Sequence, residues 1–154
     1  METFDFGDGN GPVPVHRHPS GGRVADTAYV AETAYVGPNA LVYGHAHVYG
    51  NAQVFGNAQV YGNAHVFDNA QMSGNAQVYG NAHVFDNAQV FGNAGVYGKA
   101  RVHGDARVYG NAQVYGDAQV YGKAQVYGRV HVFNNARVFG DAQVYSHARV
   151  YGDI

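Results

Sequence analysis

Cysteine is absent from this chain of 154 residues, which excludes a disulfide framework and a cysteine-based metal site. Its absence also fits a reducing compartment. Threonine occurs only at Thr3, Thr27 and Thr33, so the chain lacks the repeated small hydroxyls that an ice-binding face would need. Charge is scarce as well. The net charge is −2, which gives no electrostatic reason to expect nucleic acid as a partner.

Long apolar runs are also missing. No stretch approaches the ~20 apolar residues that a membrane-spanning helix needs. The start of the chain, METFDFGDGNGPVPVHRHP, has no basic segment followed by an apolar one, so we expect no signal peptide. We therefore expect no membrane association and a cytoplasmic location, or the phage particle if the chain is a phage product.

What the sequence has in abundance is a six-residue repeat. From Val24 to Val150 every sixth residue is valine, and Met72 is the single exception. The residue two positions earlier is alanine from Ala28 onwards, except at Val130. No insertion or deletion interrupts the pattern, whose units read NAQVYG, NAHVFD or KAQVYG. Self-similarity at a fixed short period predicts a solenoid.

Each unit predicts a short strand followed by a turn. Ala-x-Val alternates inward and outward as a half-buried strand does, and Gly-Asn, Gly-Asp or Gly-Lys then forces a turn. At Pro38-Asn39 we expect proline at the first central position of a turn and asparagine in the left-handed conformation at the second. Turns of about 120° close a triangle after three units, so 18 residues form one coil and the chain forms about seven coils.

The pattern of an aliphatic residue, a turn, and a small residue two positions before the next aliphatic one resembles the hexapeptide repeat of left-handed parallel β-helices (the LpxA-like superfamily). It covers residues 24–154. Runs of NAxVYG and NAxVFG after a glycine-rich leader are similar to YdcK-like and phage-encoded repeat proteins, so a bacterial or phage source is expected. The resemblance implies an all-β fold with a triangular section. The left hand comes from the resemblance alone, because parallel crossovers are usually right-handed.

Residues 1–23 do not repeat and are rich in glycine and proline. Such a segment cannot be a regular helix or an inner strand. Solenoid ends expose their core and a strand edge, and an atypical terminal segment usually covers them. We therefore divide the chain into an N-terminal cap segment, residues 1–23, and a hexapeptide-repeat β-helix, residues 24–154. The core of valine and alanine is predicted to be narrow and to leave no space for a ligand.

The residue after each valine is mostly aromatic, and these rings fall into three columns when the sequence is folded at 18 residues per coil. Because valine points inward, the rings are expected outside or along the corners, where they can stack. They could brace the corners, or they could contact a partner, since so many exposed rings exceed what a lone soluble rod needs. The interaction residues that we predict are one of these columns and the C-terminal residue: Tyr43, Tyr61, Tyr79, Tyr97, Tyr115, Phe133, Tyr151 and Ile154.

Histidines are the only metal-ligating candidates. His47, His65 and His83 fall on successive coils of one face, and imidazole suits zinc, copper or nickel, but no carboxylate in that column would orient them. His16 and His18 lie in the irregular N-terminal segment. We predict no metal site and no cofactor, with these five histidines as weak candidates. The outward glutamines are expected to form structural amide ladders, and the asparagine column at residues 57, 75, 93 and 111 is interpreted as turn chemistry only.

Charge is distributed unevenly along the chain. Residues 1–98 carry two basic and seven acidic side chains, a net charge of −5, whereas residues 99–154 carry seven basic and four acidic ones, a net charge of +3. This asymmetry can be sequence drift at solvated positions. If it is functional, it favours antiparallel or head-to-tail neighbours over parallel ones.

The resemblance also raises the possibility of an enzyme, because many hexapeptide proteins are trimeric acyltransferases or metal-dependent carbonic anhydrases with sites between subunits. The repeat here has no insertion that could form a projecting loop, and no catalytic residue can be carried over. We predict a non-catalytic structural or interaction rod. It would self-associate, as a trimer or an end-to-end dimer, or join a larger assembly through its aromatic corners and an open C-terminal coil. The alternatives are the enzyme with a site between subunits, and a carbohydrate- or ice-binding surface.

Overall fold

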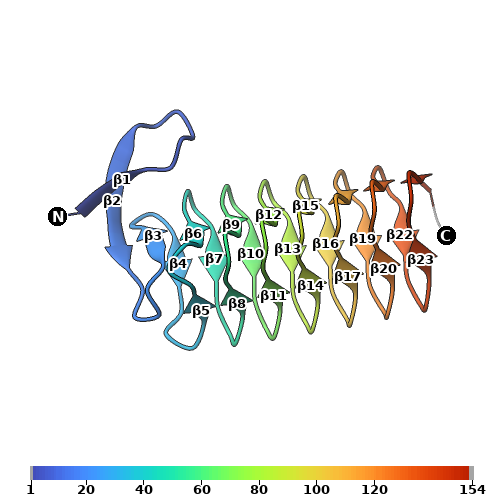
Figure 1. Cartoon of the computed structure of the whole chain (residues 1–154), viewed down its shortest axis with the longest axis horizontal. Helices are drawn as coiled ribbons and strands as arrows, with labels where there is room; N and C mark the ends of the chain where they lie inside the picture. The colour runs from blue at the N-terminus through green and yellow to red at the C-terminus, as the bar shows by residue number, and fades with distance from the viewer. Residues whose placement is uncertain (1, 153–154) are drawn as a thin grey trace.

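The computed structural model describes residues 2–152, which form a rod of stacked three-sided coils (Figure 1). Every regular element is a β-strand, and the coils follow one another along the rod in sequence order. No helix occurs in this part of the chain, so none is present that could cross a membrane. The predicted all-β parallel solenoid of about seven coils is confirmed. The hand of its winding stays a prediction of the resemblance.

Three sheets run the length of the rod, and we call them A, B and C. Sheet A contains β1 (Glu2–Asp5), β2 (Pro12–Arg17), β3 (Arg23–Ala25), β6 (Leu41–Val42), β9 (Gln59–Val60), β12 (Gln77–Val78), β15 (Gly95–Val96), β18 (Gln113–Val114), β21 (His131–Val132) and β24 (Arg149–Val150). Sheet B contains β4 (Tyr29–Val30), β7 (His47–Val48), β10 (His65–Val66), β13 (His83–Val84), β16 (Arg101–Val102), β19 (Gln119–Val120) and β22 (Arg137–Val138). Sheet C contains β5 (Tyr35–Val36), β8 (Gln53–Val54), β11 (Gln71–Met72), β14 (Gln89–Val90), β17 (Arg107–Val108), β20 (Gln125–Val126) and β23 (Gln143–Val144).

From β3 onward, neighbouring strands of one sheet are parallel and 18 residues apart, as in the pairing of His65 with His83. The ladder is continuous because each coil donates its backbone N–H groups to the carbonyls of the next, for example from His65 to Ala82 at 3.0 Å. One coil therefore satisfies the backbone of its neighbour, which a strand of two residues could not do alone.

The core is a single column of valine and alanine. The inward residues between Val36 and Val138 are buried completely or almost completely, including Met72 in the valine column and Val130 in the alanine column. Burial of each valine contributes on the order of 1.5 kcal/mol. Toward the end of the described chain, Val144 and Val150 are 7% and 8% exposed.

In the regular turns the left-handed backbone conformation falls mostly on glycine. In the regular coils the residue after the aromatic one takes a positive φ, such as +66° at Gly98, and a Cβ there would lie 2.8 Å from the backbone nitrogen of Gly116. The expectation of a left-handed Asn39 is wrong, because Asn39 does not have a positive φ. The left-handed residue comes first in each regular turn, where glycine supplies it without steric cost.

The N-terminal segment folds as a β-hairpin at the first coil. Strand β1 pairs antiparallel with β2, and β2 pairs antiparallel with β3. The expectation that this segment has no inner strand is wrong, because β2 lies between β1 and β3 in sheet A. The chain after β2 reaches the other two sheets. His18 Nε2 lies 3.0 Å from the carbonyl oxygen of Ala31, and Gly22 N–H donates to Val36 at 3.0 Å. These bonds satisfy carbonyl groups that face away from the next coil.

Candidate functional site: the outer faces of the rod

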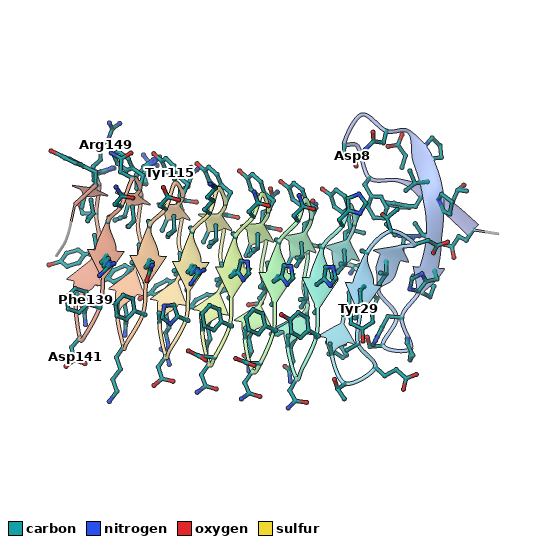
Figure 2. The ribbon with its side chains drawn as sticks, turned by 180° about the vertical axis from the view of Figure 1, so that it is seen from behind. Asp8, Tyr29, Tyr115, Phe139, Asp141 and Arg149 are labelled. Atoms are coloured by element: carbon teal, nitrogen blue, oxygen red, sulfur yellow. The ribbon has the colours of Figure 1, made fainter. Side chains whose placement is uncertain are left out.

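Side chains cover the outside of the rod in columns parallel to its axis (Figure 2). The aromatic residue after each inward valine stacks on its equivalent one coil away. Tyr61 and Tyr79, for example, have ring centroids 4.8 Å apart and planes 2° apart. The spacing of the coils sets the spacing of the rings, and an offset stacked pair contributes ~0.5–1.5 kcal/mol. Most of these rings are half-buried, because each ring is covered by the next.

The predicted interaction column follows sheet A. Its rings stack from Tyr43 to Phe133, and Phe6 of the N-terminal hairpin extends the column by stacking on Tyr43 at 4.4 Å. Tyr43 is thereby reduced to 6% exposure, whereas Tyr151 is 64% exposed. Ile154 lies outside the described residues. A binding role for this column stays a prediction.

Tyrosine hydroxyls of this column donate hydrogen bonds to glutamines on the next strand of the same sheet. Tyr61 donates to Gln77 Oε1 at 2.9 Å, and Tyr97 donates to Gln113 Oε1 at 2.8 Å. Burial, and then the neighbouring Tyr79, raise the pKa of Tyr61 to about 12, so its hydroxyl remains a donor at physiological pH.

These bonds correct our interpretation of the amide columns. The glutamine oxygens described here accept from tyrosine hydroxyls instead of forming glutamine ladders. A true amide ladder occurs in the asparagine column, where Asn75 donates to Asn93 at 3.1 Å and Asn93 donates to Asn111 at 3.2 Å. Asparagine at this corner therefore does more than make a turn, because its short side chain keeps the amides within reach of one another.

The tyrosine–glutamine pairing of sheet A is interrupted at residue 131, where the Tyr115 hydroxyl lies 3.2 Å from His131 Nδ1, and at residue 95. Residue 95 is glycine, so Tyr79 faces no amide one coil later, and no hydrogen bond from its hydroxyl occurs within residues 2–152. A Cβ on Gly95 would meet only the Tyr97 ring, at 3.8 Å. Neither the backbone nor its neighbours require glycine there.

The histidine column lies on the outer face of sheet B. The rings of His47, His65 and His83 stack at 4.7 and 4.9 Å with planes 3° apart. Stacked parallel rings do not converge on a common point as metal ligands must. Among residues 2–152, no group of three His, Asp or Glu side chains is placed to hold a metal ion.

The surroundings of this column disfavour protonation. Burial lowers the pKa of His65, and the adjacent His83 and His47 add to the effect. Burial also lowers the pKa of His83, with a further contribution from Arg101. A proton on one ring would repel the next charged group of the same column.

The two N-terminal histidines have structural partners. His16 Nδ1 lies 2.7 Å from Asp26 Oδ1 at the surface. His18 is 6% exposed, and its Nδ1 accepts from the backbone N–H of Ser20 at 3.2 Å while Nε2 faces Ala31. Both residues join the hairpin to the first coil, but they contact different residues, Asp26 and Ala31.

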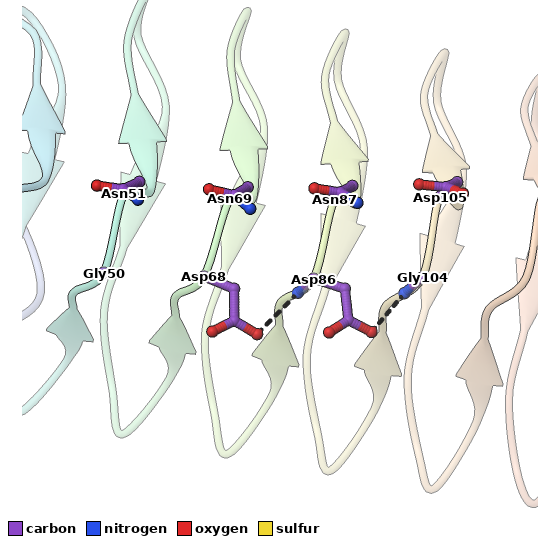
Figure 3. Close-up of a pocket in the computed structure, with 8 residues that line it drawn as sticks. All are labelled: Gly50, Asn51, Asp68, Asn69, Asp86, Asn87, Gly104 and Asp105. Carbon is purple, nitrogen blue, oxygen red and sulfur yellow. Dashed lines mark hydrogen bonds between the residues drawn. The ribbon is translucent and has the colours of Figure 1, made fainter.

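Sequence reasoning missed an acidic corner between sheets B and C (Figure 3). A groove there is lined by residues that include Asp68, Asp86 and Asp105. Asp68 Oδ2 accepts from the N–H of Asp86 at 3.3 Å, and Asp86 Oδ2 accepts from the N–H of Gly104 at 2.9 Å. Asp68 and Asp86 have φ values of 57° and 58°, at positions where other coils have glycine.

We call this feature the acidic ridge, and its members are Glu32, Asp68, Asp86, Asp105 and Asp141. Folding the corner positions at 18 residues per coil would have revealed it from sequence. The adjoining outer face of sheet B carries the three stacked histidines and then two cations, Arg101 and Arg137. The carboxylates of this corner, which also carries Lys123 between Asp105 and Asp141, therefore lie beside a face whose cations are Arg101 and Arg137.

Exposed apolar rings lie mainly where a column begins or ends. The large hydrophobic side chains classed as exposed are Tyr29, Tyr35, Phe139, Tyr145 and Tyr151. Tyr29 and Phe139, which are 53% and 42% exposed, lie toward opposite ends of the rod (Figure 2). Both belong to the side of the rod formed by sheet B, because Tyr29 lies in β4 and Phe139 follows β22.

The regular coils match a known repeat family. The model of the YdcK beta solenoid repeat matches residues 58–74, 76–90, 88–104, 106–122 and 112–128. The YdcK-like resemblance predicted from the sequence is confirmed by these matches together with the solenoid fold. No curated protein and no solved structure matches the chain.

Proposed function

We propose, from the premise that these are YdcK-type β-solenoid coils, that the protein is a non-catalytic scaffold rod whose outer faces bind other copies of itself or a larger assembly. The observation that carries the proposal is that aliphatic side chains fill the inside of the rod, whereas the polar and aromatic side chains lie on its outside. The inward residues between Val36 and Val138 are buried side chains of a filled core, so chemistry is available only on the flats and corners.

The outer columns support binding better than catalysis. Rings, amides and charges recur every coil at the spacing of the strands, which gives long and regular surfaces. Within residues 2–152 the five candidate histidines stack or bond to neighbouring groups and do not form a metal-binding group. A regular surface of this kind suits a partner with the same repeat, because each contact then recurs along the interface.

Exposed rings give such a surface an apolar component. Aromatic side chains are enriched in protein interfaces, and Tyr29, Tyr35 and Phe139 are between 42% and 53% exposed. The role of the column from Tyr43 to Phe133 as a contact stays part of the proposal, as does the role of the last coil.

Sedimentation equilibrium over the micromolar range tests the proposal. We expect a reversible oligomer of the full chain, and addition of zinc should leave its mass unchanged. A strictly monomeric protein over that range would contradict self-association. One equivalent of tightly bound zinc would contradict the proposed absence of metal chemistry.

A further inference from the structure

The aromatic column beside sheet C has a gap. It runs from Phe55 to Tyr145, and Ser73 is its one member without a ring. In the other two columns every residue from the first ring to the last carries a ring. Phe55 and Phe91 belong to the coils directly before and after that of Ser73. The gap is therefore as long as one missing ring.

The backbone at Ser73 does not exclude a ring. Ser73 N–H donates to the carbonyl of Val90 at 3.1 Å, and Phe55 N–H donates to the carbonyl of Met72 at 3.0 Å. The φ of Ser73 is not positive, and its hydroxyl makes no hydrogen bond to the chain within residues 2–152. The ladder passes through the serine as it passes through a position with a ring, so the coil does not need serine there.

Two aromatic rings border the gap. Phe91 stacks on Tyr109 with ring centroids 4.7 Å apart and planes 3° apart, so its other face is turned toward Ser73. Phe55 stacks on no aromatic ring within residues 2–152. Strands in a sheet are about 4.8 Å apart, so two coils separate these rings by about 9.6 Å. A flat ring between them would stack on both at the spacing of the intact columns, which is 4.8 Å for Tyr61 and Tyr79.

A hydrogen-bond acceptor lies beside the gap. Tyrosines of the columns donate to the glutamine 16 residues later, as Tyr109 does to Gln125 Oε1 at 3.2 Å. For position 73 that residue is Gln89, whose Oε1 accepts no hydrogen bond from the chain within residues 2–152. A ring in the gap reaches Gln89 in the same way if it carries a hydroxyl. The gap therefore matches a phenol, and not only a flat apolar group.

The surroundings of the gap are uncharged. Residues 51–62, 69–80 and 87–98 form the strands of sheets C and A in three successive coils. They contain no Asp, Glu, Lys, Arg or His. A phosphate or carboxylate on a ligand would find no cation here to compensate for lost hydration, so the chemistry favours a neutral ligand.

We infer that the gap at Ser73 is a binding slot for one neutral phenolic ring. Phe55 and Phe91 hold the ring between their faces, and Gln89 accepts a hydrogen bond from its hydroxyl. The ring belongs to a tyrosine of a second copy or is a phenol carried by another molecule, because the two offer the same chemistry. The inference goes beyond the proposed scaffold role and does not depend on self-association.

Titration of the isotope-labelled full chain with N-acetyl-tyrosine amide, followed by NMR, tests the slot. We expect binding in the millimolar range, with chemical-shift changes centred on Ser73 and Gln89. Ser73→Tyr places a ring of the chain itself in the slot and should weaken binding at least about tenfold. His103→Tyr is the matched control. Residue 103 already carries a ring, stacked between Phe85 and Tyr121, so this variant should bind as the wild type does.

N-acetyl-phenylalanine amide tests the role of the hydroxyl. It should bind about three- to tenfold more weakly than the tyrosine probe, and Gln89→Met should abolish this difference. Equal binding of the two probes to the wild type would overturn the assignment of a phenol. A Ser73→Tyr variant that binds as tightly as the wild type, or shift changes spread over all three columns, would overturn the slot. Thermal melting shows whether each variant remains folded.

Sedimentation of the same proteins identifies the source of the ring. If a tyrosine of a second copy fills the slot, Ser73→Tyr should lower the mass of the oligomer, and so should the tyrosine probe added to the wild type. If the phenol belongs to another molecule, the mass should stay unchanged. A monomeric wild type that binds the tyrosine probe would support the slot and contradict the proposed self-association, so the two failures are distinguishable.

Discussion

Sheet B and sheet A share one backbone geometry and one core, yet their outer faces differ in chemistry. On sheet A, the flat carries glutamines such as Gln77 and Gln113, which accept hydrogen bonds from the tyrosine column. On sheet B, the corresponding positions carry stacked histidines and arginines beside the acidic ridge. The inner positions are constrained by packing, whereas the outer ones are constrained only by their neighbours in the same column. A difference between faces is therefore where a function can be encoded without disturbing the fold.

The largest expected effect is the loss of stability when a valine of the core, which all three sheets share, is shortened. Val84, Val90 and Val96 lie on sheets B, C and A of successive strands and are 0% exposed. Alanine at any of them leaves a cavity and removes buried methyl groups, so the free energy of unfolding should fall by on the order of 2 kcal/mol. Denaturant titration of the three variants should give equal losses, and a much larger loss on one sheet would show that the core is not shared evenly.

A smaller change in stability is expected when the missing glutamine of sheet A is supplied at residue 95. Gly95→Gln should raise the free energy of unfolding by about 1 kcal/mol, because it restrains the unfolded chain and gives the Tyr79 hydroxyl an acceptor. Gly98→Gln is the matched control. Its φ of +66° and the 2.8 Å approach to Gly116 should make the same substitution destabilising. A destabilising Gly95→Gln would show that the glycine at position 95 is needed for another reason.

The smallest effect belongs to the histidine column of sheet B. The folded-state pKa values of His65 and His83 are lowered from 6.5, first by burial and then by neighbouring positive groups. The folded chain then binds fewer protons than the unfolded chain, so this stability is fully present above about pH 6.5 and is lost as the pH falls through the lowered values. Histidine titrates at about pH 5 to 8. The melting temperature, measured across about this range, should therefore fall as the pH is lowered.

The double variant His65→Gln, His83→Gln checks the origin of that decline. It places on sheet B the residue that sheets A and C use, and it should melt with a weaker dependence on pH than the wild type. Gln119→Asn, on the same face, changes the column without removing an imidazole and should keep the wild-type dependence. An unchanged dependence in the double variant would assign the effect to other groups.

Much of the fold follows from the sequence because the repeat is strict. The inward valines, the seven coils and the stacked aromatic columns all follow from a period of six residues and a turn after each strand. The stacking of Phe6 on Tyr43 and the contact of His18 with Ala31 could not be read in this way. Those residues lie in a segment without a repeat, so no period relates them to their partners.

The side-chain bonds on the outside were predicted less well than the core. A column of glutamines and a column of asparagines look alike in sequence, yet glutamine pairs with tyrosine and asparagine pairs with asparagine. The length of each side chain and its distance from the tyrosine hydroxyl decide the partner, and these distances exist only after the coils are stacked. The acidic ridge was missed for a simpler reason, because its members occupy two positions of the turn: Glu32, Asp68 and Asp86 the first, Asp105 and Asp141 the second.

The sequence by itself determined the solenoid, since an uninterrupted period of six leaves one way to bury a valine in every unit. Tertiary structure alone decided which polar groups bond and which rings are covered. The physical reason is that burial of an aliphatic residue depends on its own position in the repeat. Hydrogen bonds and charge complementarity depend on atoms that are 16 or 18 residues apart and meet only through the winding of the chain.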